Sequence, residues 1–434
     1  MNLLFQHLIF LIYAVVLLLF SFDYTNVVVI STSNSVIGST EPEQLIEIIK
    51  AIPFNNTILS SLIIDSISNL VYVSGMPDHS YNYSCLKDNM TSIYGSVSEL
   101  PCSTIYILNG STGEINNSIT LRAGEIIHDM TIDPYSGKIY AAGEYNYLEN
   151  KSEPILYEDD VVFIISQIDG SNLSQQYTHS NDIERIRLYG EQEEGKEGDM
   201  SSIAIDVHTG KIYAGIRYFQ GGLEGVFIID KNMTSSIKPN STTDDDFPFA
   251  IKFIPLGDTG PDQILVNDKT HIAYVSLKND NFVALINGLN NTVQEKIILQ
   301  EPRAMSISPS AGLLYVASGD NNWFNVIDIK TNKVISTNTQ IAHPIGSVVN
   351  NITNRIYVTD CHLCDDYNFT TGTSIYALNS TGSTVDWKTY EVLNLLENEL
   401  AINPNTNKLE LISLKYQMFI SLIPGTNRSN IKSL

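Results

Sequence analysis

The segment Asn351–Thr359, with the sequence NITNRIYVT, contains a pattern that returns along most of the chain. A turn with Asn or Gly is followed by a basic or small residue, an aliphatic residue, Tyr, and then small or β-branched residues. Six copies centre on a tyrosine and a seventh has Glu instead; these positions are Tyr72, Tyr140, Tyr213, Tyr274, Tyr315, Tyr357 and Glu410. A long internal repeat of this kind largely decides the fold.

Each copy has the same sequence neighbourhood, and residues 306–336 show it best. A short strand at 306–308 ends in the turn 309–312, and the Tyr315 strand follows. A β-branched run at 324–329 comes next, then the turn 330–333 and a fourth apolar run at 334–336. Four short strands joined by tight turns form a β-meander. Steps of about 42 residues between tyrosines are typical of propeller blades, so the sequence predicts an all-β, seven-bladed β-propeller.

The copy around Asn351–Thr359 follows the pattern N-x-x-T-N-[KR]-I-Y-V-T and resembles the YVTN-type β-propeller repeat. The resemblance covers roughly residues 45–425 and is strongest from Gln263 to Gly382. That family consists largely of exported surface proteins, many of them archaeal. The resemblance therefore implies a propeller at the cell surface, and it implies no common activity.

The ends of the repeat region predict how the ring closes. The last copy supplies three strands, at 400–402, 409–412 and 418–421, whereas Leu45–Pro53 precedes the first copy and has the composition of an outer strand. An unclosed propeller would leave two open sheet edges. We therefore expect residues 45–53 to complete the last blade. The predicted organisation is a signal segment at 1–22, a linker at 23–44, the propeller at 45–425 and a C-terminal tail at 426–434.

The N-terminus carries an apolar run, Leu3–Phe20, interrupted only by Gln6 and His7. Its length is just enough for a helix that crosses a bilayer. No small-x-small cleavage site follows it, and no basic residue precedes Lys50. A retained signal anchor is the favoured interpretation of this N-terminal hydrophobic helix, with a cleaved signal peptide and a buried helix as alternatives. The expected location is the extracellular face of the cell membrane, or the secreted fraction.

Glycosylation sequons support export. Fourteen are present, and several are expected to carry glycans, although turn-rich chains also generate sequons by chance. They lie at Asn55, Asn82, Asn89, Asn109, Asn116, Asn150, Asn172, Asn232, Asn240, Asn290, Asn351, Asn368, Asn379 and Asn427.

The four cysteines, Cys85, Cys102, Cys361 and Cys364, also suit an oxidising compartment. The pairing that is local in sequence joins Cys85 to Cys102 and Cys361 to Cys364. A four-thiolate metal site and free thiols are the alternatives, and the single C-x-x-C gives the metal site little support.

The meander also predicts two different ends of the ring. Turns after the first and third strands share one end and are short in nearly every copy. The expected insertions, such as 75–103, 143–159, 180–199, 236–262 and 360–373, are all placed at the other end. Long loops on a rigid scaffold are the usual form of a binding surface. We therefore expect a binding or cell-envelope structural module that contacts an envelope protein or a glycan through this long-loop face.

The strong negative charge has several interpretations. The formal net charge is −23 and the pI is about 4.6, which argues against nucleic-acid binding. Acidic clusters such as Asp244, Asp245 and Asp246 can simply keep loops soluble, or they can hold a divalent cation or a basic partner. Without the spacing of an EF-hand, these three residues are only weak candidates for a Ca²⁺ site, and no other cofactor is expected.

Catalytic patterns are missing from the sequence. The eight histidines are scattered, and no H-E-x-x-H, G-x-S-x-G or P-loop pattern is present. We therefore assign no catalytic residues. The alternative is a propeller hydrolase or lactonase with a metal in the central channel, near which His128, Asp129 and His208 are expected. The repeated tyrosines are expected to pack between blades, with hydroxyl groups bonded locally.

Overall fold

The computed structural model describes residues 47–54, 57–77, 101–149, 155–165, 183–189, 198–218, 224–231, 250–360, 374–388, 400–413 and 418–423. The predicted signal segment, the linker and the C-terminal tail lie outside these residues. Within the described stretches, no helix has the length and apolarity needed to cross a bilayer.

The described residues form 28 strands and one short 3₁₀-helix, η6 (Gly319–Asn321). The first half of the chain contains β1 (Glu47–Pro53), β2 (Thr57–Asp65), β3 (Leu70–Pro77), β4 (Thr104–Asn109), β5 (Ile115–Thr120), β6 (Glu125–Asp133), β7 (Lys138–Glu149), β8 (Ile155–Ile165), β9 (Ile183–Tyr189), β10 (Gly198–Asp206), β11 (Lys211–Tyr218), β12 (Gly225–Asp230) and β13 (Ala250–Pro255). The second half contains β14 (Gln263–Asn267), β15 (Ile272–Leu277), β16 (Phe282–Asn287), β17 (Thr292–Ile298), β18 (Met305–Ser308), β19 (Leu313–Ser318), β20 (Trp323–Asp328), β21 (Lys333–Asn338), β22 (Pro344–Asn350), β23 (Arg355–Asp360), β24 (Ile375–Leu378), β25 (Val385–Lys388), β26 (Leu400–Asn403), β27 (Lys408–Ser413) and β28 (Met418–Ile423).

These strands pair into seven four-stranded antiparallel sheets, one for each copy of the repeat. We call them blades 1 to 7: β2–β5, β6–β9, β10–β13, β14–β17, β18–β21, β22–β25, and β26–β28 with β1. The first strand of each blade contacts the first strands of its two neighbours, and β26 contacts β2, so the contacts run around a full ring. The predicted all-β fold with a propeller arrangement is confirmed.

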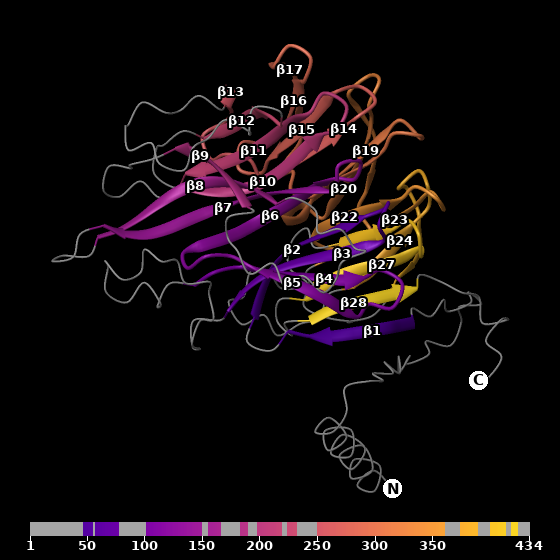
Figure 1. Ribbon diagram of the computed structural model, residues 1–434. Helices are drawn as coiled ribbons and strands as arrows, with labels where there is room; N and C mark the ends of the chain where they lie inside the picture. Colours follow the sequence, from indigo (N-terminus) through magenta and orange to yellow (C-terminus); the bar gives the residue numbers. More distant parts are fainter. Residues whose placement is uncertain are drawn as a thin grey trace, which may run out of the picture.

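Ring closure follows the expected scheme. Strand β1 pairs antiparallel with β28, from Glu47 opposite Ile423 to Pro53 opposite Met418. Figure 1 shows the indigo β1 beside the yellow β28, although the two strands come from opposite ends of the chain. The outer edge of β28 is thereby covered, and a strand from the N-terminal part closes the last blade, as predicted.

The connection between the first and second strands, here called the inner turn, explains why the repeat is rich in Asp, Asn and Gly. In most blades the side-chain oxygen of its first residue accepts hydrogen bonds from the backbone amides two and three residues later, as at Asp206 and Asn350. Four residues after the first, φ lies between 54° and 71° in all seven blades, a region that Gly and Asn enter at low cost. These positions are Asn69, Gly137, Gly210, His271, Gly312, Asn354 and Asn407.

The repeated tyrosines pack between neighbouring blades, as predicted. All six are at most 2% exposed. Tyr72 packs with residues of blades 1 and 2, and Tyr357 with residues of blades 6 and 7. The Tyr315 hydroxyl donates to the backbone carbonyl of Ser380 in the next blade, at 2.9 Å. The expectation of a bonded hydroxyl does not extend to Tyr213, whose buried hydroxyl has no hydrogen-bond partner.

The expectation that all long connections share one end is wrong at two places. The connections 166–182 and 231–249 join third to fourth strands, so they leave from the same end as the inner turns. We call this end the turn face and the opposite end the insertion face. A second correction concerns residues 143–159, most of which extend the paired strands β7 and β8 up to Glu149 opposite Ile155. This hairpin projects beyond the other strands in Figure 1.

Deleting residues 42–54 tests ring closure. The deletion removes β1 and the buried Phe54 and leaves the edge of β28 open, so the melting temperature should fall by about 10 °C or more. Deletion of residues 28–40, which has the same length, is the matched control and should leave it unchanged. Equal melting temperatures for the two deletions, measured by calorimetry, would contradict closure by β1.

Candidate functional site

The inner strands of blades 1 to 5 are joined by one repeated side-chain contact. The acceptor lies two residues before the residue that pairs with the repeat tyrosine. Ser61 Oγ accepts from the Met130 amide at 3.1 Å, Asp129 Oδ2 from Ile203 at 2.9 Å, and Ser202 Oγ from Ile264 at 3.1 Å. Gln263 Oε1 accepts from the Met305 amide in the same way. Each polar side chain thus binds the backbone of the next blade.

Asp129 is the one ionisable member of this series. Its oxygens also accept hydrogen bonds from its own neighbour Met130 and from the hydroxyl groups of Ser61 and Ser202. Desolvation raises the pKa of this carboxyl, and these hydrogen bonds counteract part of the shift. Asp129 was expected near the central channel, and its hydrogen bonds join the inner strands of blades 1, 2 and 3.

A second set of contacts joins the blades at the turn face. His271, Asn407 and Asn69, each the fifth residue of an inner turn, contact the first residue of the preceding blade's turn. The distances are 2.8 Å to Asp206, 2.5 Å to Asn350 and 2.9 Å to Asn403. In blade 3 the fifth residue is Gly210, and the Lys231 side chain passes over it to reach Asp133 at 2.9 Å.

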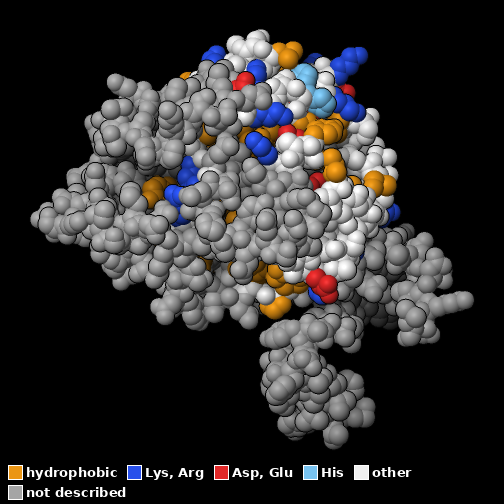
Figure 2. Space-filling model, viewed as in Figure 1, with side chains coloured by type: hydrophobic (Ala, Val, Ile, Leu, Met, Phe, Trp, Pro, Cys, Tyr) orange, Lys and Arg blue, Asp and Glu red, His pale blue; other side chains and the backbone are white. Residues whose placement is uncertain are grey.

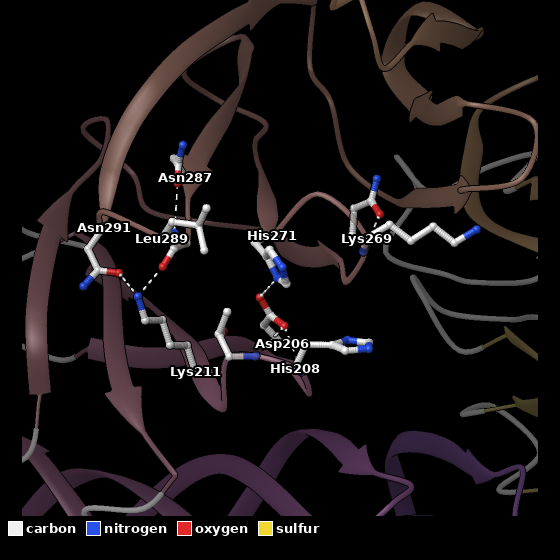
Figure 3. Close-up of polar contacts among 11 residues, drawn as sticks. Asp206, His208, Lys211, Lys269, His271, Asn287, Leu289 and Asn291 are labelled. Atoms are coloured by element: carbon white, nitrogen blue, oxygen red, sulfur yellow. Dashed lines mark hydrogen bonds and ion pairs between the residues drawn. The ribbon is translucent and has the colours of Figure 1, made fainter.

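A group of four ionisable side chains at the turn face lies where the inner turns of blades 3 and 4 meet. Asp206 and His208 come from the first turn, Asp268 and His271 from the second. Asp206 is 0% exposed; its Oδ1 accepts from the amides of His208 and Thr209, and its Oδ2 contacts His271 Nδ1 at 2.8 Å. Figure 3 shows Asp206 between the two histidines. The imidazole rings of His208 and His271 are 6.2 Å apart.

The electrostatics of the two aspartates differ. Burial alone would raise the pKa of Asp206, but the Thr209 amide and His271 outweigh it, so this pKa lies below the usual value. Burial and the nearby Asp206 charge raise the pKa of Asp268. Asp206, His208 and Asp268 each place one potential ligand atom within 4.8 Å of the others. Among the described residues, these three are the group of His, Cys, Asp or Glu side chains that could hold a metal ion.

The tips of the inner turns form a ring of seven residues on the turn face. Three of them, Ile67, Tyr135 and Ile352, are at least 60% exposed. The ring consists of Ile67, Tyr135, His208, Lys269, Ser310, Ile352 and Asn405. In blade order 6, 7, 1 and 2 the tips are mainly apolar, whereas blades 3 and 4 contribute His208 and Lys269. The turn face therefore has a mainly apolar part at one side of the ring and a polar part at blades 3 and 4.

Glu410, which replaces the repeat tyrosine in blade 7, is buried like the tyrosines. Its Oε2 has no hydrogen-bond partner, and Ser421 lies directly opposite on β28. Burial raises its pKa to about 7, against smaller lowering effects from Ser421 and Lys408. Lys408 is directed to the next blade, where its Nζ donates to the Ser111 carbonyl at 2.7 Å.

Most of the site residues predicted from the sequence lie outside the described residues. These include Asp244, Asp245 and Asp246, so the Ca²⁺ site stays a prediction. Cys85, Cys361 and Cys364 are also outside. Cys102 is buried and disulfide-bonded, and the predicted pairing of the four cysteines is not tested further.

Five sequons fall within the described residues: Asn109, Asn116, Asn290, Asn351 and Asn379. Asn290 and Asn351 are exposed in turns. The side-chain oxygens of Asn109, Asn290 and Asn379 accept hydrogen bonds within their own turns. Glycosylation stays a prediction at all fourteen positions, and within the described stretches Asn290 and Asn351 offer the most open attachment points.

Sequence reasoning had placed His208 near the channel but had not joined it to Asp206, Asp268 and His271. The available signal was a departure from the repeat. Six of the seven inner turns have Ser, Pro, Val or Asn at the second position, and only blade 4 has an acidic residue, Asp268. Aligning the turns, and then comparing adjacent copies, would have brought the four residues together.

Comparison with known proteins supports the fold alone. No family model and no curated protein matches the sequence. Among solved structures, a chain in the "Crystal Structure of Mitotic Checkpoint Complex" is similar, with a TM-score of 0.57 and 10% sequence identity over 93% of this chain and 100% of that chain. At this identity the match shows a shared β-propeller arrangement and no shared activity.

The raised pKa of Glu410 predicts a specific pH dependence of stability. The native state binds the proton more tightly than the unfolded state, so this contribution is fully present below about pH 4.5 and is lost as the pH rises through 7. Glu410→Gln should therefore raise the free energy of unfolding at pH 8 by up to about 3 kcal/mol, with little effect at pH 4.5. Urea denaturation at both pH values measures this, with exposed Glu114→Gln as control. A Glu410→Gln effect that is the same at both pH values would contradict the assignment.

Proposed function

We propose that this chain is a cell-surface or secreted binding or envelope-structural module, presented outside the cell as a YVTN-type β-propeller. The observation that carries the proposal is the hydrogen bonding between the inner strands of blades 1 to 5. Polar side chains of the inner strands are bonded to the next blade, as Ser61, Asp129 and Ser202 show, while insertions extend from the strand ends. Such a scaffold holds variable loops without moving.

The insertion face supplies the contact surface in this proposal. Its most defined feature is the β7–β8 hairpin, which extends well past the level at which the other blades turn. Away from this hairpin, Figure 2 shows hydrophobic side chains of the described residues in several separate groups among charged and polar ones. The partner proposed for the insertion face is a glycan or an envelope protein.

Export is supported by the sequence. The apolar run Leu3–Phe20 and the fourteen sequons are the features that favour it. The similar structure named above is a multi-protein complex, and propellers in general serve as platforms for protein contacts. The partner of this chain is therefore expected to be macromolecular, and the metal-dependent hydrolase or lactonase stays the alternative function.

The test uses cells that express the full chain with a C-terminal tag. The tag should be accessible to antibody without permeabilisation, and the cells should retain isolated envelopes of the source organism. A variant in which Asn-Gly replaces residues 146–158 joins Tyr145 to Asp159, a cross-strand pair, through a two-residue turn. This variant should show the same surface staining and at least tenfold weaker retention. A tag reached only after permeabilisation, or equal retention by both proteins, would overturn the proposal.

A further inference from the structure

We propose that Asp206, His208 and Asp268 bind a divalent transition-metal ion, with Zn²⁺ as its representative, at the junction of the inner turns of blades 3 and 4. The site lies on the turn face, away from the insertion face that carries the proposed binding function. The proposed metal site can therefore be tested independently of that function.

The three potential ligand atoms surround a point that a metal ion could occupy. Because the atoms lie within 4.8 Å of one another, some point lies no more than about 2.8 Å from all three. Zn²⁺ binds imidazole nitrogen and carboxylate oxygen at about 2.0–2.2 Å. Small rotations of exposed His208 and partly exposed Asp268 close the remaining distance, while Asp206 stays fixed.

Asp268 supplies a second observation in favour of a cation. Its Oδ1 is fully buried and has no hydrogen-bond partner. A buried carboxylate oxygen without a partner is costly, and a second carboxylate, Asp206, adds repulsion. The Val207 amide and the two nearby histidines offset only part of this cost. A divalent ion would satisfy the oxygen and reverse the repulsion. The nearby Lys211 extends to Asn291, away from Asp206.

The neighbours of Asp206 act as a supporting layer. The amides of His208 and Thr209 fix one oxygen, and His271 Nδ1 holds the other at 2.8 Å. Metal-binding carboxylates are commonly held by such outer hydrogen bonds, which set their orientation before the ion arrives. His271 is therefore a positioning residue, and its own nitrogen is not needed as a ligand.

The ligand types select the class of ion. One imidazole and two carboxylates suit Zn²⁺, Co²⁺ or Mn²⁺, whereas Ca²⁺ and Mg²⁺ prefer oxygen ligands alone. Three protein ligands leave a coordination position for water, and exposed His208 places that position toward solvent.

The repeat itself does not require these side chains. At the second position of the inner turn the seven blades have Ser66, Pro134, Val207, Asp268, Pro309, Asn351 and Pro404. At the third position His208 is the sole histidine among the seven tips. The inner turn therefore forms in other blades without an acidic residue at the second position or a histidine at the third. Asp268 and His208 are thus not required by the turn and are available to bind an ion.

Titration calorimetry of the full chain in detergent, after removal of metals with a chelator, tests the proposal with Zn²⁺. The parent protein should bind at least one Zn²⁺ that His208→Gln and Asp268→Asn lose or bind at least tenfold more weakly. His343→Asn is the control, because His343 lies between blades 5 and 6, away from the junction of blades 3 and 4, and it should bind as the parent does.

Two further readouts separate a lost site from a lost fold. Co²⁺ bound to the parent should give a visible absorption band that is absent from His208→Gln and Asp268→Asn. Saturating Zn²⁺ should raise the melting temperature of the parent and of His343→Asn, but that of Asp268→Asn much less. Absence of Zn²⁺ binding by the parent, or equal binding by all variants, would overturn the proposal.

Discussion

The packing of blades 1 to 5, more than half of the ring, depends on one recurring interaction, a polar side chain on an inner strand that binds the backbone amide of the next blade. Sheets packed face to face by apolar residues alone could slide, because hydrophobic contact has little directional preference. The hydrogen bonds from Met130 to Ser61, from Ile203 to Asp129 and from Ile264 to Ser202 fix the register between blades. The tyrosines then fill the space between sheets whose relative position is already set.

Departures from the repeat carry most of the specific chemistry. Where blades 1, 3 and 4 have the neutral acceptors Ser61, Ser202 and Gln263, blade 2 has Asp129, and where the other blades have Tyr, blade 7 has Glu410. Both carboxyl groups have raised pKa values because burial disfavours the charged form. Asp268 is a third departure, and it lies next to a second carboxylate and a histidine. In a repeat protein the common residues maintain the fold, so the exceptions are the first places to look for function.

The sequence predicts the fold well and the site poorly, for a physical reason. Tight turns, the tyrosine period and the apolar run before the first copy are local signals, and they were enough to predict the propeller arrangement and the β1–β28 pairing. The expected loop at 143–159 was wrong because alternating residues there continue β7 and β8 as a long hairpin. The cluster of Asp206, His208 and Asp268 arises from side chains about 60 residues apart, which meet only when two blades pack.

Amide hydrogen exchange in the variant Ser202→Ala is the most direct test of the cross-blade contact. The substitution removes the acceptor of the Ile264 amide and one donor to Asp129. Exchange at Ile264 should become at least about tenfold faster than in the parent, with a smaller change at Ile203 and none in distant blades. An Ile264 amide that exchanges at the parental rate would show that apolar packing alone holds the blades in register.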